Sequence, residues 1–122
     1  MKTENIIKDK SFSFAISIVR VYQHLTSEKK EFIISKQLLR SGTSIGANIE
    51  ESLGSQSQAD FIHKLSISYK EARETVYWVK LLEATSYFSK DEAQSLLTDA
   101  EEVCKIIAKI LLTNKKKVQI KK

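Results

Sequence analysis

Hydrophobic residues recur every three or four positions through four long stretches of the chain, and this spacing predicts four amphipathic helices. The stretches cover about residues 6–25, 27–53 and 57–85, and the fourth begins near residue 89. Because the breaks between them are short, each helix should run antiparallel to the one before it. The pattern therefore predicts an all-α fold, an antiparallel up-down-up-down four-helix bundle.

Two apolar stripes run along the first predicted helix, where the other helices have one. One stripe contains Phe14, Ile18, Val21 and Leu25, and the other contains Phe12, Ala15, Ile16, Val19 and Tyr22. One of them can enter the bundle core, which leaves the other for a second partner surface. The predicted core stripes of the later helices are Ile34, Leu38, Ile45, Ile49 and Leu53; Phe61, Leu65, Tyr69, Ala72, Val76 and Val79; and Ala93, Leu96, Leu97, Ala100, Val103, Cys104, Ile107 and Leu111.

Short motifs mark three of the predicted helix ends. Ser57 to Asp60 has the S-x-x-D form of a helix start, and Ser89 to Glu92 has the S-x-x-E form of a capping box. Gly54 follows the second stretch and can take the left-handed conformation that ends many helices. Within that stretch, the glycines at positions 42 and 46 lie beside the core stripe, and we interpret them as packing residues that allow a neighbouring helix to approach closely.

Composition agrees with a single helical domain covering residues 1–122. The chain has no Pro and three Gly, with 42% hydrophobic and 29% charged residues, which favours long helices. The N-terminus alternates charges where a signal peptide would be apolar, and no apolar run is long enough to span a bilayer. The single cysteine, Cys104, cannot form an intramolecular disulfide. We therefore expect a cytoplasmic protein with no membrane association.

The net charge of +5 is concentrated at the C-terminal end. Residues 103–122 contain seven lysines and no acidic residue, so 13 basic and 15 acidic residues remain in the rest of the chain. These lysines are Lys105, Lys109, Lys115, Lys116, Lys117, Lys121 and Lys122. They can complement the helix dipole and keep the protein soluble, or an oligomer could gather several such basic tails, at about residues 113–122, to hold RNA or DNA phosphates without reading sequence. No aromatic residue is interleaved with these lysines, so base stacking is not indicated.

A polar stripe of mixed composition runs along the second predicted helix. It consists of Gln37, Arg40, Ser44, Asn48 and Glu51, spaced three or four residues apart. A matching stripe on the third helix consists of Lys64, Ser68, Glu71, Thr75 and Trp78, with Glu74 at its edge. Pairing of Arg40 with Glu71 or Glu74 would fix helix register or a subunit contact. Three interpretations stay open: a structural polar network or interface, plain solvent exposure, and a ligand or nucleic-acid site.

The chain carries none of the common catalytic or cofactor motifs. There is no P-loop, no dinucleotide fingerprint and no H-E-x-x-H zinc motif. Asp60 to His63 is a single D-x-x-H and His24 lies on another helix, whereas di-iron bundles need Glu-x-x-His pairs on two helices. Surface positions suit the histidines better, and Cys104 suits the role of a small hydrophobe. We predict no catalytic residue, no metal and no cofactor, and expect the protein not to be an enzyme.

The run from Gln37 to Ser52 closely resembles the signature Q-x-x-R-A-x-x-S-I-x-x-N-I-x-E-G of the bacterial four-helix bundle family, also called 23S rRNA intervening-sequence proteins. The run from Lys70 to Trp78 is similar to a second motif found in one subgroup. The family's motif residues match Gln37, Arg40, Ser44, Asn48 and Glu51, and its later glutamate matches Glu74. Ser52 stands where the family usually has Gly.

This resemblance implies a homopentamer without known enzymatic activity, often encoded within inserts in the large ribosomal RNA gene. Proteins of similar shape serve diversity-generating retroelements, where a basic pentamer is thought to engage nucleic acid and a reverse transcriptase. Here the body of the chain is nearly neutral, unlike that precedent. The leading hypothesis is a non-enzymatic assembly protein, a homopentamer with sequence-independent affinity for RNA or DNA. The alternative is a protein-binding adaptor whose basic tail is merely solubilising.

Overall fold

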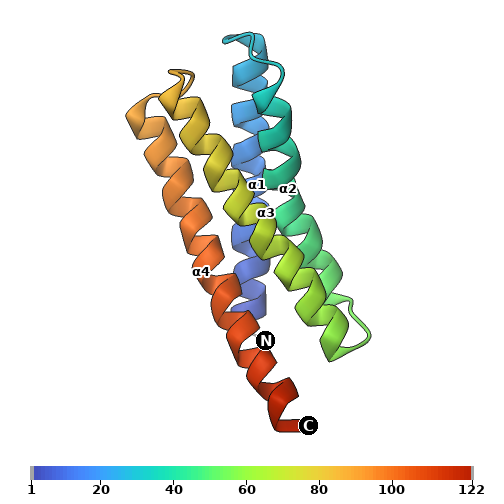
Figure 1. Ribbon diagram of the computed structural model, residues 1–122. Coiled ribbons are helices and arrows are strands. Elements are labelled where there is room, and N and C mark those ends of the chain that lie inside the picture. The colour runs from blue at the N-terminus through green and yellow to red at the C-terminus, as the bar shows by residue number, and fades with distance from the viewer. Residues whose placement is uncertain (1, 122) are drawn as a thin grey trace.

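The computed structural model describes the backbone of residues 2–121 and the side chains of residues 3–116. It contains the helices α1 (Lys2–Ser27), α2 (Ile34–Leu53), α3 (Gln58–Ala84) and α4 (Lys90–Lys121), and no strand occurs between residues 2 and 121. In Figure 1 the chain crosses the molecule along each helix and returns along the next. The predicted all-α four-helix fold is confirmed.

One continuous apolar core lies between the helices. Its most deeply buried large side chains are Ile7, Ile18, Leu25, Leu38, Ile45, Ile49, Leu65, Val79, Leu82, Val103 and Ile107. Burying each of these side chains is worth roughly 1.5–3 kcal/mol relative to leaving it in water. Helices α2 and α3 pack most closely, whereas α1 and α4 make the fewest contacts of any neighbouring pair. The bundle therefore has one close seam and one loose one.

The start of α2 differs from the prediction, because the helix begins at Ile34 and not near residue 27 or 28. The connection after α1 contains Lys30 in the left-handed conformation, with φ of 57°, which interrupts any continuous helix. The Glu31 carboxylate then accepts hydrogen bonds from the backbone N–H groups of residues 33–35, at 2.6–3.2 Å. In addition, the Ser35 hydroxyl donates to the Glu31 carbonyl at 2.8 Å. The Glu31 carboxylate therefore accepts hydrogen bonds from the backbone N–H groups at the start of α2, which have no partner within the helix.

The predicted starts of α3 and α4 are confirmed. Ser57 Oγ accepts a hydrogen bond from the Asp60 N–H at 3.0 Å. Ser89 and Glu92 exchange two reciprocal bonds: Ser89 N–H donates to Glu92 Oε1 at 2.9 Å, and Glu92 N–H donates to Ser89 Oγ at 3.1 Å. The expected left-handed stop at Gly54 is wrong, since its φ is −94°. A side chain there would meet only a backbone oxygen at 3.8 Å, so this end of α2 does not require glycine.

Three details of the predicted core and tail also change. Leu53 is 38% exposed because it is the last residue of α2, at the end of the bundle. On α3, Ser68 and Thr75 are buried, while Tyr69 and Val76 are only half-buried, because small hydroxyl residues allow α2 to approach. The segment predicted as a basic tail, residues 113–122, continues α4 as helix to residue 121.

Candidate functional site

The polar stripes of α2 and α3 meet along the close seam, and Arg40 joins them. Its Nη1 atom lies 3.1 Å from Glu71 Oε2, and its Nη2 atom contacts Glu74 Oε2. On its own helix, Arg40 Nε donates a hydrogen bond to Gln37 Oε1 at 3.4 Å. The pairing expected from the sequence is therefore present, and the arginine contacts both carboxylates. We call this set, together with Glu51 and Lys64, the polar seam.

Glu74 has a second partner besides Arg40. Trp78 Nε1 donates a hydrogen bond to Glu74 Oε2 at 2.9 Å, so this carboxylate oxygen accepts from two side chains. The Trp78 ring is half-buried and meets the exposed Tyr77 ring edge to face, with centroids 5.0 Å apart. The indole thus restricts where the carboxylate can lie, and the carboxylate in turn positions the guanidinium of Arg40.

At the other end of the polar seam, Lys64 Nζ lies 3.0 Å from Glu51 Oε1. The hydrogen bond and the negative charge of Glu51 raise the pKa of Lys64 above its ordinary value. Ser44 and Asn48, between the two ion pairs, bond back to their own helix: Ser44 Oγ donates to the Arg40 carbonyl and Asn48 Nδ2 to the Ser44 carbonyl. The stripe predicted on α2 therefore divides into residues that bridge to α3 and residues that do not.

Buried hydroxyl groups lie beneath the polar seam. Thr75 Oγ1 donates to Ser41 Oγ at 2.9 Å, and Ser68 Oγ donates to the Ile45 carbonyl at 2.8 Å. The ion pairs above them are partly exposed, and such pairs contribute only about 0–1 kcal/mol each to stability. The main effect of the seam is to fix the register between α2 and α3.

The second apolar stripe of α1 faces outward. Phe14, Ile18 and Leu25 enter the core, whereas Phe12, Ile16 and Val19 remain exposed, Phe12 to 67%. Ile6 is also exposed, so the outer surface of α1 carries four large apolar side chains. We call Ile6, Phe12, Ile16 and Val19 the α1 apolar face. Ala15 and Tyr22, predicted in the same stripe, are half-buried.

The described lysines of the predicted nucleic-acid site lie between the middle and the C-terminal end of α4. Lys105, Lys109, Lys115 and Lys116 are exposed, whereas the side chains of Lys117, Lys121 and Lys122 lie outside the described residues. Asn114 Oδ1 accepts a hydrogen bond from Gln58 Nε2, at the start of α3. Figure 1 shows the C-terminal end of α4 continuing past the loop between α2 and α3.

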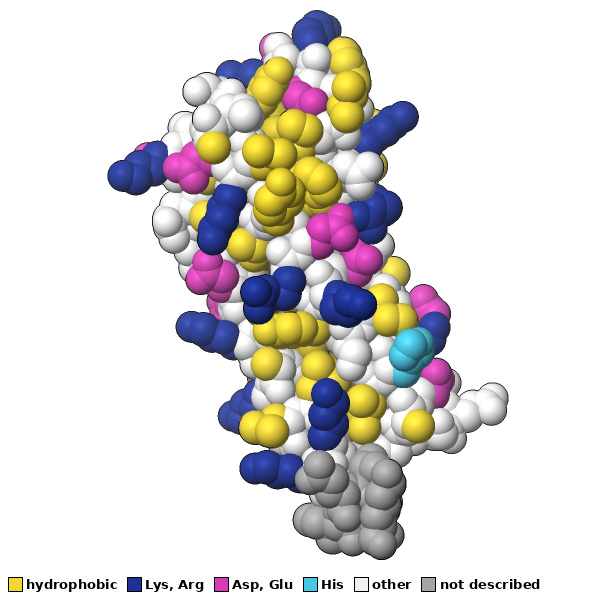
Figure 2. All heavy atoms as spheres, viewed as in Figure 1, with side chains coloured by type: hydrophobic (Ala, Val, Ile, Leu, Met, Phe, Trp, Pro, Cys, Tyr) yellow, Lys and Arg dark blue, Asp and Glu magenta, His cyan; other side chains and the backbone are white. Residues whose placement is uncertain are grey.

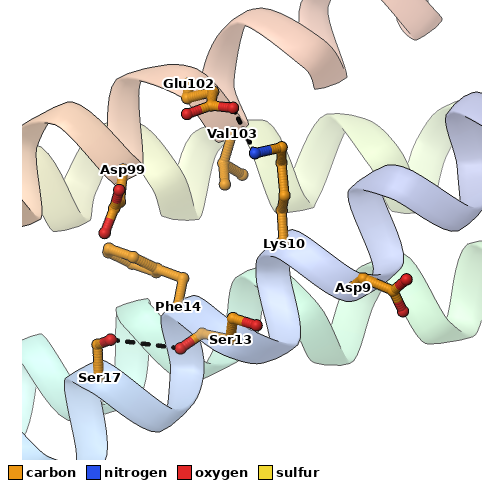
Figure 3. Close-up of a pocket in the computed structure, with 8 residues that line it drawn as sticks. All are labelled: Asp9, Lys10, Ser13, Phe14, Ser17, Asp99, Glu102 and Val103. Atoms are coloured by element: carbon orange, nitrogen blue, oxygen red, sulfur yellow. Dashed lines mark hydrogen bonds and ion pairs between the residues drawn. The ribbon is translucent and has the colours of Figure 1, made fainter.

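Along the loose seam, α1 and α4 enclose a hollow of about 280 Å³, which the sequence did not predict. Figure 3 shows Lys10 of α1 directed at Glu102 of α4, with which it forms an ion pair, and Phe14 lying beside Asp99. Ser17 Oγ donates to the Ser13 carbonyl at 3.4 Å, within α1. The lining contains no histidine or cysteine. Within the described part of the chain, no three His, Cys, Asp or Glu side chains are grouped to hold a metal ion.

An all-α bundle with an ion-paired polar seam and exposed apolar and basic helix faces belongs to the class of small helical-bundle proteins. The chain matches the family described as 23S rRNA-intervening sequence protein over residues 3–109, and it belongs to that family. Its fold is similar to the crystal structure of a protein of unknown function from the S23 ribosomal protein family of Bacteroides thetaiotaomicron. That similarity has a TM-score of 0.89 and 50% identity, over 89% of this chain and 97% of the other.

Among curated proteins, no sequence matches this chain significantly. None of the described helices has an apolar stretch of the length and hydropathy needed to cross a membrane.

Proposed function

We propose that the protein is a non-enzymatic assembly protein that forms a homo-oligomer through the α1 apolar face. The observation that carries this proposal is the exposure of Ile6, Phe12, Ile16 and Val19 on one helix whose opposite side is already buried in the core. Several large apolar side chains exposed on the outer side of one helix are typical of a protein-protein contact. Burying a Phe or Ile side chain contributes about 1.5–3 kcal/mol, so covering these residues would stabilise an assembly substantially.

Five copies is the number that the family resemblance implies. A closed ring of five needs two different contact surfaces on each copy, because only contacts between unlike surfaces generate odd rings. The α1 apolar face would then contact a different face of the next copy. The charged residues beside it, including Lys8, which lies 3.8 Å from Glu50 of α2, would form the polar rim of that contact.

A sequence-independent affinity for RNA or DNA forms the second part of the proposal. Lys105, Lys109, Lys115 and Lys116 project from one helix, and an oligomer would present several copies of this set together. Phosphate contacts from exposed lysines give binding that weakens steeply with salt and does not depend on base sequence. The absence of catalytic motifs from the sequence supports a role in binding and assembly.

Light scattering coupled to size-exclusion chromatography tests the assembly. We expect the intact protein at micromolar concentration to have five times the 13.9 kDa mass of one chain. The double variant Phe12→Ser, Ile16→Ser should dissociate, because both side chains would leave the contact. Ile33→Ser is the matched control, since Ile33 is 78% exposed but lies in the loop before α2. A monomeric wild-type protein would refute the proposal.

The nucleic-acid part is tested by truncating the chain after Asn114, which keeps the bond between Asn114 and Gln58. RNA affinity is measured at about 50 and 200 mM salt, for the intact and the truncated protein. We expect truncation to weaken binding and to reduce its salt dependence. If the intact protein assembles but binds no RNA, the adaptor function replaces this part of the proposal.

A further inference from the structure

A shallow groove runs along the outer surface between α3 and α4. It contains a hollow of about 400 Å³ lined by Ser66, Tyr69, Lys70, Ala108, Leu111, Leu112 and Lys115. Leu112 is 58% exposed, and the Tyr69 ring is half-buried. The floor of the groove is therefore apolar and aromatic, with one lysine on each rim. Figure 2 shows this face: hydrophobic side chains gather between the two helices, and Lys and Arg side chains stand on both sides of them.

Arg73 adds a third cation to the groove from α3. Its guanidinium carbon lies 6.0 Å from the centroid of the Tyr69 ring, and its Nη1 atom donates to the Tyr69 hydroxyl at 3.3 Å. Because Tyr69 lines the hollow together with Ala108 and Leu112 of α4, this arginine lies beside the groove. Lys105 is the next residue along α4 and is exposed. Cations from two helices thus line the same groove, although they are far apart in sequence.

Acidic charge precedes the lysines along α4. Glu101 is exposed and lies four residues, about one helical turn, before Lys105. Farther toward the C-terminal end of α4, the charged residues that line the hollow are Lys70 and Lys115, and Arg73 is bonded to Tyr69 beside them. The positive stretch therefore points toward the remaining lysines of α4.

We propose that this groove binds single-stranded RNA, with phosphates on Lys70, Arg73 and Lys115 and bases against Tyr69 and Leu112. This inference rests on the nucleic-acid part of the proposed function and identifies its site. An anionic ligand fits the charge of the rims, and an apolar floor favours a strand whose base faces are free, which a duplex does not offer. The hydroxyl groups of Ser66 and Tyr69 lie at the hollow and can bond the ribose 2′-hydroxyl, which distinguishes RNA from DNA.

The groove also supplies an aromatic ring for base stacking. No aromatic residue is interleaved with the lysines of residues 105–122 along the chain. In space, however, Tyr69 of α3 lies between the lysines of the two helices. An arginine stacked on an aromatic ring beside other cations is an arrangement that single-stranded nucleic-acid sites use.

The test compares the double variant Lys70→Gln, Arg73→Gln with the control Arg20→Gln, Lys36→Gln, whose residues are exposed cations on α1 and α2. Each variant is titrated into a short fluorescent single-stranded RNA at about 50 and 200 mM salt. Losing two phosphate contacts lowers the slope of log binding constant against log salt concentration by about 1.4. The factor by which affinity falls between about 50 and 200 mM salt should therefore be about sevenfold smaller for the variant than for wild type. The control should keep the wild-type slope. Tyr69→Leu should weaken binding at both salt concentrations without changing the slope.

Several outcomes would overturn the inference. The groove is not the site if the Lys70, Arg73 variant binds RNA like the control while truncation after Asn114 abolishes binding. In that case the proposed function still stands. Equal affinity for single-stranded DNA, tighter binding of duplex, or equal competition by an acidic peptide would refute RNA as the occupant. A change of oligomeric state in the groove variant would identify the groove as a subunit interface. If wild-type protein binds no RNA, the nucleic-acid part of the proposed function fails together with this inference.

Discussion

Two glycines of α2 provide a matched test of how closely α1 and α2 pack. A Cβ atom built at Gly42 would lie 2.8 and 2.9 Å from the two γ carbons of Ile18, well inside ordinary contact distance. At Gly46 the nearest atoms, the carbonyl oxygen and Oγ of Ser11, are 3.5 Å away, which is an ordinary van der Waals contact. We therefore expect Gly42→Ala to destabilise the fold and Gly46→Ala to stabilise it.

The magnitude follows from two opposing effects. Replacing glycine by alanine inside a helix gains about 0.8–1.0 kcal/mol of helix propensity at either position. At Gly42 the new methyl group also forces the fully buried Ile18 to move, and overpacking of this kind costs roughly 1–3 kcal/mol. Since the propensity gain is common to both variants, their difference in unfolding free energy isolates the overlap, at about 1–3 kcal/mol.

Urea unfolding followed by circular dichroism measures this difference, with both variants compared at equal protein concentration because assembly adds to apparent stability. Equal stabilities for the two variants, or a more stable Gly42→Ala, would show that α1 can move away from α2 at little cost. Ile18→Ala in the Gly42→Ala background serves as a further check. Because Ile18→Ala removes both γ carbons that the new methyl group meets, the double variant should be less destabilised than the sum of the two single variants.

Three further predictions concern single side chains. Burial raises the pKa of Glu31, but hydrogen bonds from Ser35 and its neighbours outweigh this and lower it below 4.5. The resulting stability is therefore present above about pH 4.5 and is lost as pH falls further, and urea midpoints of Glu31→Gln should lack this dependence. Arg40→Gln leaves two adjacent carboxylates, so unfolding free energy should fall by about 1 kcal/mol, with partial recovery in Arg40→Lys. Burial raises the pKa of the Cys104 thiol, so iodoacetamide should alkylate it more slowly in folded than in urea-unfolded protein.

Local signals explain which helix ends could be predicted. The starts of α3 and α4 depend on a serine and an acidic residue three positions later, so they are readable within four residues. The start of α2 depends on Glu31, whose carboxylate reaches forward over residues 33–35 after a left-handed residue at position 30. Neither the turn nor this use of glutamate has a distinctive sequence pattern. The apolar spacing of α2 also continues into the loop before it.

Some contacts of the candidate site could be predicted from the sequence and others could not. The pairing of Arg40 with Glu71 and Glu74 could be predicted because both partners lie on regular stripes of helices that are adjacent in sequence. The joining of Lys70 and Arg73 with the α4 lysines could not, because it depends on the rotation of α3 about its axis. The buried face of α3 includes the hydroxyl residues Ser68 and Thr75, which a hydrophobic pattern counts as polar.

The unequal packing of the four helices gives the molecule a preferred place to open. Helices α1 and α4 are the first and last helices of the described residues, no loop connects them, and a hollow lies between parts of the two helices. Separating them would wet Phe14 and Val103 while leaving the α2 and α3 pair intact. Amide protons on the facing sides of α1 and α4 should therefore exchange with deuterium sooner than those of α2 and α3. The same edge would let one copy exchange α1 with another, because within the described residues a single loop joins α1 to the rest of the bundle.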